Sequence, residues 1–312
     1  MFWDKLLQRI EIFIKLAVVL MVVTYVYDGC SGSQGNDNKT DGTDTLPTAV
    51  AKSDTVITAP SPDTTGNKTA KKAKKSTPAK VEGNIASLEI PVNPEGLSST
   101  VRERASYTVS YNHDTRNPNW VAWVLTSTHT NGGVSRKSYD FRDDTDMPAP
   151  KGYKSDYYKS GYDRGHLCPA GDNKWSGAAM SDCFLMTNMC PQNASLNRGV
   201  WNNIEEQCRD WADRYGKLYI VSGPIYYSNE HRTIGGHGVA VPDAFFKVIL
   251  CVEGTPKAIG FICGNHSQKG RKKTEFVESV DDVERATGYD FFSLLPDSVE
   301  DIVESTCSYS QW

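Results

Sequence analysis

Residues 161–170 of the chain read GYDRGHLCPA and form its densest cluster of chemically distinctive side chains. Arg164 stands two positions before His166, and a proline follows at position 169. This combination is not typical of a buried strand, because charged side chains are costly to bury and proline removes a backbone donor. A histidine beside an arginine suits a site that handles protons and anions. The stretch is therefore a candidate functional site, although His166 taken alone would be read as a structural histidine.

A second group of polar residues follows about 30 positions later. Asn197, Trp201 and Glu205 are spaced at i, i+4 and i+8 within residues 195–215, whose apolar side chains recur with helical spacing. At about 100° per residue, Asn197 and Glu205 lie roughly 80° apart, on one side of the predicted helix. An Asn and a Glu so placed could meet a common ion and its water shell, whereas Trp201 is predicted to pack in the core.

These residue types suit the hydrolysis of a phosphodiester bond. The reaction needs a base for the attacking water, a cation for the phosphoryl oxygens and charge relief for the departing oxygen. A neutral histidine can take a proton near pH 7, and an arginine can stabilise phosphoryl charge. A hard cation such as Mg²⁺, held through oxygen ligands and water, can stabilise the leaving oxygen. The pattern contains no zinc-type cage of histidines and carboxylates.

The segment Asp163-Arg164-Gly165-His166 resembles the DRGH motif of the DNA/RNA non-specific endonucleases, the ββα-metal nucleases that include endonuclease G. The similarity runs from about Ser106 to Pro296. Further matching segments occur in the same order: residues 138–144 (SYDFRDD), 188–192 (NMCPQ), 197–205 (NRGVWNNIE) and 241–247 (VPDAFFK). A lone DRGH would be a weak signal, but the ordered set is specific. The resemblance implies an α+β fold of the ββα-metal type, with a central, mainly antiparallel sheet flanked by helices.

The resemblance also assigns roles to the three residues of the proposed catalytic centre. His166 would be the general base. Asn197 would be the single direct protein ligand of Mg²⁺ or Mn²⁺, and Glu205 would hold a metal-bound water. Ordinary alternatives exist for the last two, because Asn197 could simply occupy the first turn of its helix and Glu205 could be an exposed helix residue.

Three further residues complete the implied site. Arg164 and Asn188 would contact the phosphate or support His166. An upstream arginine stabilises the transition state in the family, and both Arg136 and Arg142 fall near that place. We favour Arg142.

The resemblance implies cleavage of the bond to the 3′ oxygen of DNA and RNA, leaving a 5′ phosphate, through contacts to the backbone rather than to the bases. Endonuclease G relatives are often dimers, so a homodimer is one option. Two alternatives remain open. One is a non-catalytic cell-envelope protein that binds nucleic acid, and the other is a phosphodiesterase for a small or lipid substrate.

The rest of the folded part indicates a mainly antiparallel α+β structure. Residues 107–111 and 120–125 are predicted to form a strand pair, with Asn117-Pro118 as turn material between them. The long helix is expected to begin at Ser195 and to stop at Gly216. The other predicted elements are strands at 184–189, at 218–221 before a turn at 222–224, at 244–252 and at 258–263, and a helix at 280–287 ending at Gly288.

Residues 1–85 differ from the rest of the chain. Lys5, Arg9 and Lys15 precede the apolar run from Leu16 to Tyr27, which is typical of an export signal or a membrane anchor in residues 1–30. Residues 31–85 are rich in Ser, Thr and Lys and have no aromatic side chain, so they are predicted to be a disordered linker. Residues 86–312 form the predicted nuclease domain. The protein is therefore expected to be exported and either anchored in the cell envelope, periplasmic or secreted.

Composition supports one folded unit of ordinary globular type. The chain has 312 residues with a formal charge of −4, and its ten Phe, seven Trp and fifteen Tyr can fill a sizeable core. These values exclude a multi-span membrane protein, a coiled coil and a collagen-like chain. Cys30 precedes the linker, and the seven other cysteines are an odd number, so at least one is free or pairs elsewhere. Cys168 directly follows the DRGH region and is a candidate for a structural disulfide.

Overall fold

The computed structural model describes residues 79–81, 86–306 and 308–312. The predicted anchor in residues 1–30, most of the predicted linker at 31–85 and Cys307 lie outside the described residues. Within them, none of the helices combines the length and the apolar character that crossing a bilayer requires.

A seven-stranded sheet forms the centre of the described part, and all of its strand pairs are antiparallel. The predicted α+β class with a mainly antiparallel sheet is confirmed. In spatial order the strands are β1 (Thr100–Glu103), β2 (Thr108–Asn112), β3 (Asn117–Thr126), β6 (Lys217–Ile225), β9 (Ala244–Cys251), β10 (Lys257–Gly264) and β11 (Val277–Glu278).

Side chains of the central strands alternate between two hydrophobic clusters, one on each face of the sheet. In β3, Val121 and Trp123 belong to the first cluster, whereas Trp120 and Ala122 belong to the second. This follows from the two-residue period of a strand, which sends successive side chains to opposite faces. Both faces are therefore covered by other elements, which explains why these strands are apolar almost throughout.

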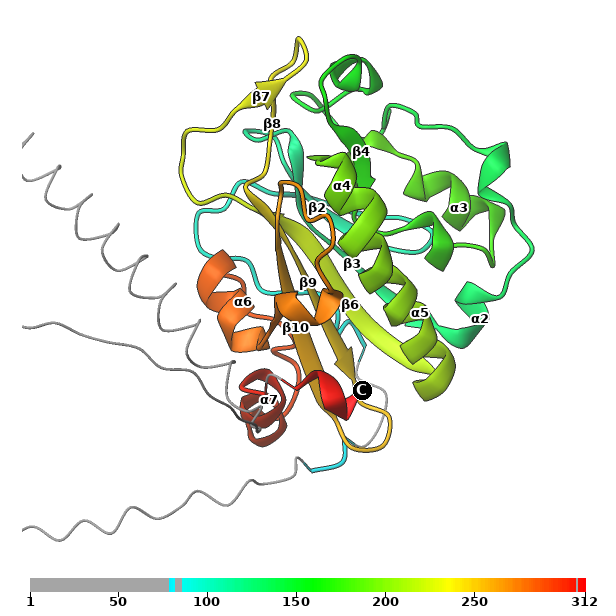
Figure 1. The fold of residues 1–312 in the computed structure, drawn as a ribbon, viewed down its shortest axis with the longest axis vertical. Coiled ribbons are helices and arrows are strands. Elements are labelled where there is room, and N and C mark those ends of the chain that lie inside the picture. The colour runs from blue at the N-terminus through cyan, green and yellow to red at the C-terminus, as the bar shows by residue number, and fades with distance from the viewer. Residues whose placement is uncertain (1–78, 82–85, 307) are drawn as a thin grey trace, which may run out of the picture. The chain divides into compact units, whose positions relative to one another are not determined.

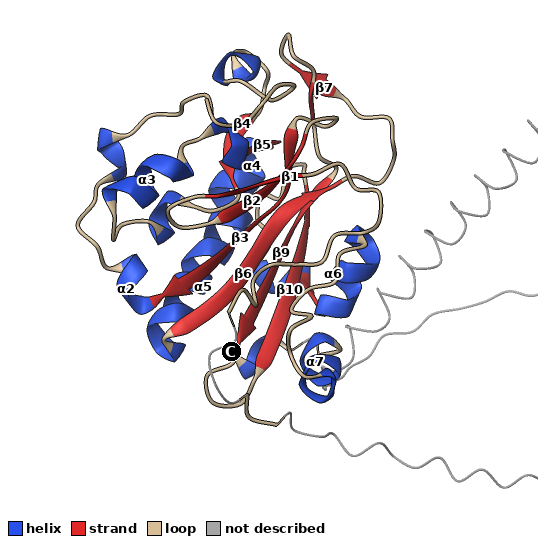
Figure 2. Ribbon diagram, turned by 180° about the vertical axis from the view of Figure 1, so that it is seen from behind, coloured by secondary structure: helices blue, strands red, loops and turns tan. Residues whose placement is uncertain are grey.

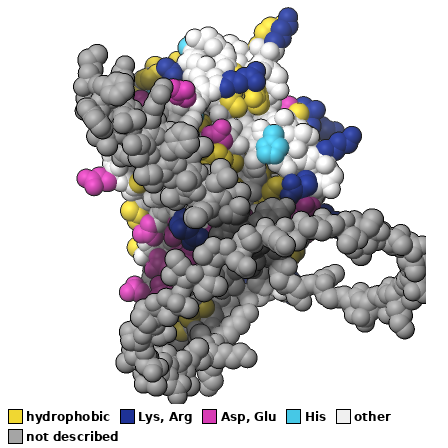
Figure 3. All heavy atoms as spheres, turned by 60° about the vertical axis from the view of Figure 1, so that its left-hand side comes forward, with side chains coloured by type: hydrophobic (Ala, Val, Ile, Leu, Met, Phe, Trp, Pro, Cys, Tyr) yellow, Lys and Arg dark blue, Asp and Glu magenta, His cyan; other side chains and the backbone are white. Residues whose placement is uncertain are grey.

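Helices cover the two faces (Figures 1 and 2). The first cluster packs under α5 (Asn202–Tyr215), and the second under α6 (Val280–Thr287) and α7 (Asp297–Glu304). Figure 2 shows the sheet in front of α5. The side of α6 and α7 comes forward in Figure 3, where acidic side chains gather on one part of the visible surface. Shorter helices are α2 (Ser127–Thr130), α3 (Gly177–Cys183) and α4 (Ala194–Leu196).

A separate hairpin carries the DRGH segment. Strand β4 (Asp163–His166) pairs antiparallel with β5 (Met189–Gln192), so that His166 lies opposite Met189. A second small hairpin joins β7 (Thr233–Ile234) to β8 (Val239–Ala240). The DRGH residues therefore stand on a short strand outside the main sheet, at the end where α4 and α5 begin (Figure 1).

Glycine at position 165 is required by close packing within this hairpin. A Cβ built on Gly165 would lie 2.6 Å from Cβ of Gln192, which is buried on the neighbouring strand. Real Cβ atoms do not approach so closely, so any side chain here would push β4 away from β5.

Several predicted boundaries are wrong, each for an identifiable reason. Residues 184–189 are not one strand: α3 ends at Cys183 with Phe184 as its C-cap, a 3₁₀ turn spans Met186–Asn188, and β5 begins only at Met189. The apolar side chains of this run are buried in two different hydrophobic clusters, Phe184 in one and Met186 and Met189 in the other, and they do not need a continuous strand to be buried. Asn117-Pro118 is not the turn but the start of β3, and the chain reverses at residues 113–116, where Arg116 has φ of 56°.

The predicted turn at residues 222–224 is also absent, because β6 continues to Ile225. Gly223 serves close packing here, since a Cβ on it would lie 2.5 Å from the Asn119 carbonyl oxygen and 2.6 Å from the Phe246 ring. By contrast, the predicted helix at 280–287 ends at Gly288 as expected, with that glycine in the left-handed conformation (φ 77°).

Candidate active site

Four of the predicted site residues, Arg164, His166, Asn197 and Glu205, line one cleft of about 680 Å³. The DRGH hairpin, the segment after it and the start of the long helix supply most of its wall. Four arginines and two carboxylates line it, so its charged groups are mainly positive. The lining includes Arg136, Phe141, Asp163, Arg164, His166, Asn197, Arg198, Glu205 and Arg209.

His166 presents a ring nitrogen that no protein group uses. Its Nε2 atom is buried and has no hydrogen-bond partner among the described residues. The imidazole packs against the rings of Phe141 and Phe184, with centroid distances of 5.4 and 5.2 Å, and these two rings also contact each other. Burial, together with the charges of Arg136 and Arg164, lowers the pKa of His166 to about 3. The ring is therefore neutral at ordinary pH and can accept a proton.

Asn197 is held by its amide nitrogen, which donates to Oδ2 of Asp163 at 2.9 Å. An ionised carboxylate only accepts hydrogen bonds, so the amide must turn its NH₂ group toward Asp163. This leaves Oδ1 of Asn197, a residue of the cleft wall, as a free oxygen ligand. Asp163 also forms an ion pair with Arg198 at 2.6 Å.

The helix that carries Asn197 is not continuous. Its N-cap is Asn193, whose side chain accepts from the backbone nitrogens of Ser195 and Leu196, so the predicted cap at Ser195 is wrong. The backbone then breaks at Gly199, with φ −115° and ψ −110°, before α5 begins at Asn202. The predicted stop at Gly216 is confirmed. Counting 100° per residue from Asn197 to Glu205 is therefore not valid across Gly199, yet both residues line the cleft.

Glu205 lies in the first turn of α5, with its carboxylate in a poorly solvated position. Burial raises the pKa of Glu205 to about 7, and the charge of Lys247 opposes that rise. Lys247 is fully buried beneath the site, with Nζ 4.7 Å from the ring centroids of both Trp123 and Trp201. Trp201 is fully buried too, as predicted for a packing residue.

Asn188 supports the site from below and does not line it. Its side chain accepts from the backbone nitrogen of Cys168 at 3.0 Å and donates to the carbonyls of Cys168 and Cys183 at 2.9 and 2.8 Å. The residue is fully buried. These three bonds fix the backbone immediately after His166, so Asn188 fits the supporting role and not direct contact with a phosphate.

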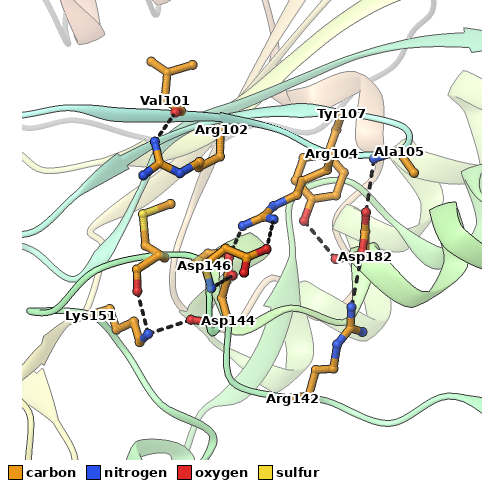
Figure 4. Close-up of polar contacts among 12 residues, drawn as sticks. Val101, Arg102, Arg104, Ala105, Tyr107, Arg142, Asp144, Asp146, Lys151 and Asp182 are labelled. Carbon is orange, nitrogen blue, oxygen red and sulfur yellow. Dashed lines mark hydrogen bonds and ion pairs between the residues drawn. The ribbon is translucent and has the colours of Figure 1, made fainter.

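Arg142 lies outside the cleft lining, and the preference for it over Arg136 does not fit the structure. The Arg142 guanidinium donates to the carbonyl of Ser181 and pairs with Asp182 at 3.2 Å. Figure 4 shows the contact with Asp182. Arg136 lines the cleft instead, and its charge helps to lower the pKa of His166. Arg164 is also in the lining, with its guanidinium 4.3 Å from the Phe141 ring centroid.

Several cleft residues were not predicted from the sequence. Arg209 pairs with the buried carboxylate of Asp172 at 3.0 Å, and Asp163 orients Asn197. Arg209 follows Glu205 by four positions in a helix, a spacing that could have revealed it. Asp163 stood inside the quoted motif without an assigned role, and its partnership with a residue 34 positions away has no local signal.

The oxygen donors of the cleft fit a hard divalent cation. Asn197 offers an amide oxygen and Glu205 a carboxylate, while the lining contains one histidine and no cysteine. Hard cations such as Mg²⁺ prefer oxygen ligands and retain water, whereas zinc prefers nitrogen and sulfur. The nearby charges of Lys247, Arg209 and Arg136 favour the ionised form of Glu205, which is the form that binds a cation or its water.

The six described cysteines of the folded part are buried free thiols: Cys168, Cys183, Cys190, Cys208, Cys251 and Cys263. The structural disulfide considered for Cys168 is therefore not formed with any of the described cysteines. Its thiol lies within the first hydrophobic cluster and accepts a weak hydrogen bond from Asn173 at 3.4 Å.

The chain is similar in sequence to known nucleases. The chain is 36% identical to the mitochondrial nuclease EXOG of Danio rerio over 218 residues, covering 64% of this chain and 64% of that protein. It is 32% identical to the mitochondrial nuclease of Saccharomyces cerevisiae over 249 residues, covering 70% and 76%. The chain thus spans less than two thirds of the zebrafish relative, and 62% of its human counterpart.

A solved structure also aligns with the fold. A chain in the crystal structure of the EndoG/EndoGI complex matches with a TM-score of 0.60 and 29% identity, covering 63% of this chain and 87% of that one. The family model for DNA/RNA non-specific endonucleases matches residues 84–298, which include the DRGH hairpin, the Asn197 turn and Glu205. The chain therefore belongs to the DNA/RNA non-specific endonuclease family.

Proposed function

We propose that the protein is a metal-dependent endonuclease that hydrolyses phosphodiester bonds of DNA and RNA without sequence preference and leaves 5′ phosphates. One observation carries the proposal. The unpartnered Nε2 of His166 and the side chains of Asn197 and Glu205 belong to one cleft whose wall also holds four arginines. A binding protein would need the arginines but neither a poised base nor an oriented oxygen ligand.

His166 would act as the general base. Its neutral ring takes a proton from the attacking water through Nε2, and the two flanking aromatic rings hold the imidazole in place. A phosphate bound in the cleft would offset the positive charge of Arg136 and Arg164. Because those charges depress the pKa of His166, substrate binding makes the base stronger at the moment it is needed.

The arginines would hold the scissile phosphate and stabilise the charge that develops on its oxygens. Arg136 and Arg164 are the candidates nearest to His166, since both act on its pKa. Arginine contacts to phosphate carry no sequence information, which accounts for the absence of base preference.

Mg²⁺ or Mn²⁺ is the proposed cofactor. Oδ1 of Asn197 would bind it directly, and Glu205 would hold one of its waters. When bound, the cation would stabilise the phosphoryl and leaving oxygens as a Lewis acid. Asp163 keeps the amide of Asn197 in the required orientation.

A cleavage assay on the full chain tests the function. Supercoiled plasmid and single-stranded RNA are incubated with Mg²⁺, with Mn²⁺ or with EDTA. We expect metal-dependent loss of both substrates by the wild type and by His231→Ala, whose histidine does not line the cleft. His166→Ala should be inactive yet folded. End-labelling by a kinase only after phosphatase treatment would identify 5′ phosphates. Salt-sensitive binding without product in any metal would support a non-catalytic nucleic-acid-binding protein instead.

We also propose that the protein is exported, with residues 1–30 as its signal or membrane anchor and residues 31–85 as a linker. The basic flank and the apolar run of Leu16 to Tyr27 support this. Protease treatment of intact cells should remove the nuclease domain if it lies outside the cytoplasm. Light scattering of the purified chain would decide between a monomer and the homodimer that the resemblance allows.

A further inference from the structure

A group of carboxylates lies between α6 and α7, and none of its members lines the nuclease cleft. Asp281 and Glu284 stand one turn apart on α6, and Glu304 is the last residue of α7. The two helices are neighbours at one edge of the described part in Figures 1 and 2. They cover the face of the sheet opposite to α5, so this group and the nuclease cleft are supported by different elements.

The three carboxylates are close enough to share one ion. Each offers an oxygen, and these oxygens all lie within 4.8 Å of one another. Calcium binds oxygen ligands at about 2.3–2.6 Å, so two ligands on opposite sides of the ion are about 5 Å apart and all other pairs are closer. The arrangement therefore meets the distance condition for a Ca²⁺ site without movement of the backbone.

The Glu304 side chain is buried and one of its oxygens lacks a partner within the described part of the chain. Only 5% of its surface is exposed, and its Oε1 atom is buried with no hydrogen-bond partner among the described residues. This oxygen belongs to a side chain that faces Asp281 and Glu284. A buried carboxylate without a partner is strongly unfavourable, and it is normally paired with a cation, bound to a metal or protonated.

The surrounding charges make the need for a cation greater. Besides its two closest neighbours, Glu304 is influenced by the carboxylates of Glu300 and Asp290. The nearest basic residue on α6, Arg285, pairs with Asp282 and also donates to the carbonyl of Asp281. Burial and these like charges raise the pKa of Glu304 to about 9, and burial raises that of Glu284 to about 7. Figure 3 shows acidic side chains gathered on this side of the molecule.

We propose that Asp281, Glu284 and Glu304 bind one Ca²⁺ ion that joins α6 to α7. Three carboxylates supply up to six oxygens, and water can complete the six to eight ligands that Ca²⁺ takes. Mg²⁺ demands shorter bonds and octahedral geometry, and zinc favours nitrogen and sulfur ligands that this group lacks. The site would hold the C-terminal helix to the sheet, and it does not depend on the proposed nuclease activity.

The experiment uses the full chain carrying Asn197→Ala, which removes the proposed active-site ligand so that any remaining Ca²⁺ binding is separate from the nuclease cleft. Ca²⁺ binding is measured by titration calorimetry up to about 10 mM, beyond the 10⁻⁴–10⁻³ M range of extracellular calcium modules. The midpoint of thermal unfolding is measured with Ca²⁺ and with EDTA. Variants in this background are Glu304→Gln, Asp281→Asn and the control Asp301→Asn, an exposed carboxylate on the same helix.

We expect one Ca²⁺ to bind to the background chain and to Asp301→Asn, with a rise in the unfolding midpoint. Glu304→Gln should weaken binding at least about tenfold and abolish that rise. In EDTA it should be no less stable, because Gln has nearly the same size and brings no charge into the buried position. Asp281→Asn changes a half-buried position and should also weaken Ca²⁺ binding and reduce the rise in the unfolding midpoint. It therefore tests the proposal even if Glu304→Gln does not fold. No heat and no shift in the background chain would overturn the proposal in favour of carboxyls that share a proton. Equal binding by Glu304→Gln and Asp281→Asn would overturn it as well.

Discussion

Oδ2 of Asp163 accepts a hydrogen bond from the side-chain amide of Asn197 at 2.9 Å, and this bond decides which end of the amide faces the cleft. Removing the carboxylate in Asp163→Ala should free Asn197 to rotate. We expect the Mg²⁺ concentration for half-maximal cleavage to rise about 10–100-fold, the usual effect of losing a residue that orients a ligand. Saturating metal should recover most of kcat. Arg198→Ala is the control. It removes the exposed ion pair with Asp163 but keeps the hydrogen bond between Asp163 and Asn197, so it should change the metal requirement little. An unchanged requirement in Asp163→Ala would contradict the orienting role.

Arg136 and Arg142 should separate cleanly. Arg136→Ala removes a cleft guanidinium and should lower kcat/KM about 10²–10³-fold, as expected for a group that stabilises developing charge. Arg142→Ala breaks a contact to Ser181 and Asp182 away from the cleft. It should keep cleavage within about tenfold and cost about 1 kcal/mol of stability. Steady-state kinetics and urea unfolding of both variants check this, and the reverse ranking would restore Arg142 as the catalytic arginine.

Asn188→Ala should combine a loss of stability with a loss of activity. The change leaves three buried backbone groups of Cys168 and Cys183 without their partners, each at a cost of about 1–3 kcal/mol. The backbone after His166 then loses its support. We expect a large fall in the urea midpoint and a lower kcat at temperatures where the variant is still folded. Full kcat in the folded variant would show that Asn188 has a purely structural role.

Gly165→Ala tests the packing of the DRGH hairpin. Its new methyl group would overlap the buried Gln192 side chain, so β4 must shift relative to β5. We expect a destabilisation of about 1–3 kcal/mol, typical of overpacking, and a displaced His166 with reduced kcat. Gly161→Ala is not a suitable control, because Gly161 has φ of 84°. Gly236→Ala is suitable, since a Cβ there meets no atom within 4 Å.

His166 is half-buried, with its Nε2 atom shielded from water, and it should make the fold sensitive to acid. Its folded pKa is lowered to about 3, whereas an unfolded histidine titrates near 6.5. Between these values the unfolded chain binds more protons, so stability falls as the pH decreases through this window. Wild-type unfolding free energy in EDTA should therefore decline more steeply below about pH 6.5 than that of His166→Gln, by up to about 1.4 kcal/mol per pH unit. Parallel curves would indicate a solvated imidazole.

Sequence patterns predicted the sheet well where both faces are buried. The strands around Trp123, Val248 and Ile259 are continuous apolar runs, and the capped helix at 280–287 has a local start and stop. Boundaries failed where a residue serves a distant neighbour. Gly223 resembles a turn glycine, but its place is set by Phe246 and by the carbonyl of Asn119.

The residues of the proposed catalytic centre could be predicted because they lie in short motifs, whereas the residues that support them could not. His166, Asn197 and Glu205 all reach the cleft as expected. The partners of Asp163 and Arg142 lie 34 to 40 positions away, and no local period encodes such pairs. The contacts of the buried Lys247 with Trp123 and Trp201 likewise have no local signal, because the three residues lie on two strands and one helical turn that meet only in the folded chain.

Because the helix breaks at Gly199, the two oxygen donors of the cleft, Asn197 and Glu205, lie on two different segments. Asn197 is fastened to β4 through Asp163 and to the cap at Asn193, while Glu205 is fixed by the rigid body of α5. A cation between them would therefore be bound by two segments that are held separately. The distance between the two donors would depend on the conformation of the short turn that carries Asn197. Substitutions in residues 193–199 are accordingly the place to retune which metal the enzyme prefers, because they move one donor and leave the other still.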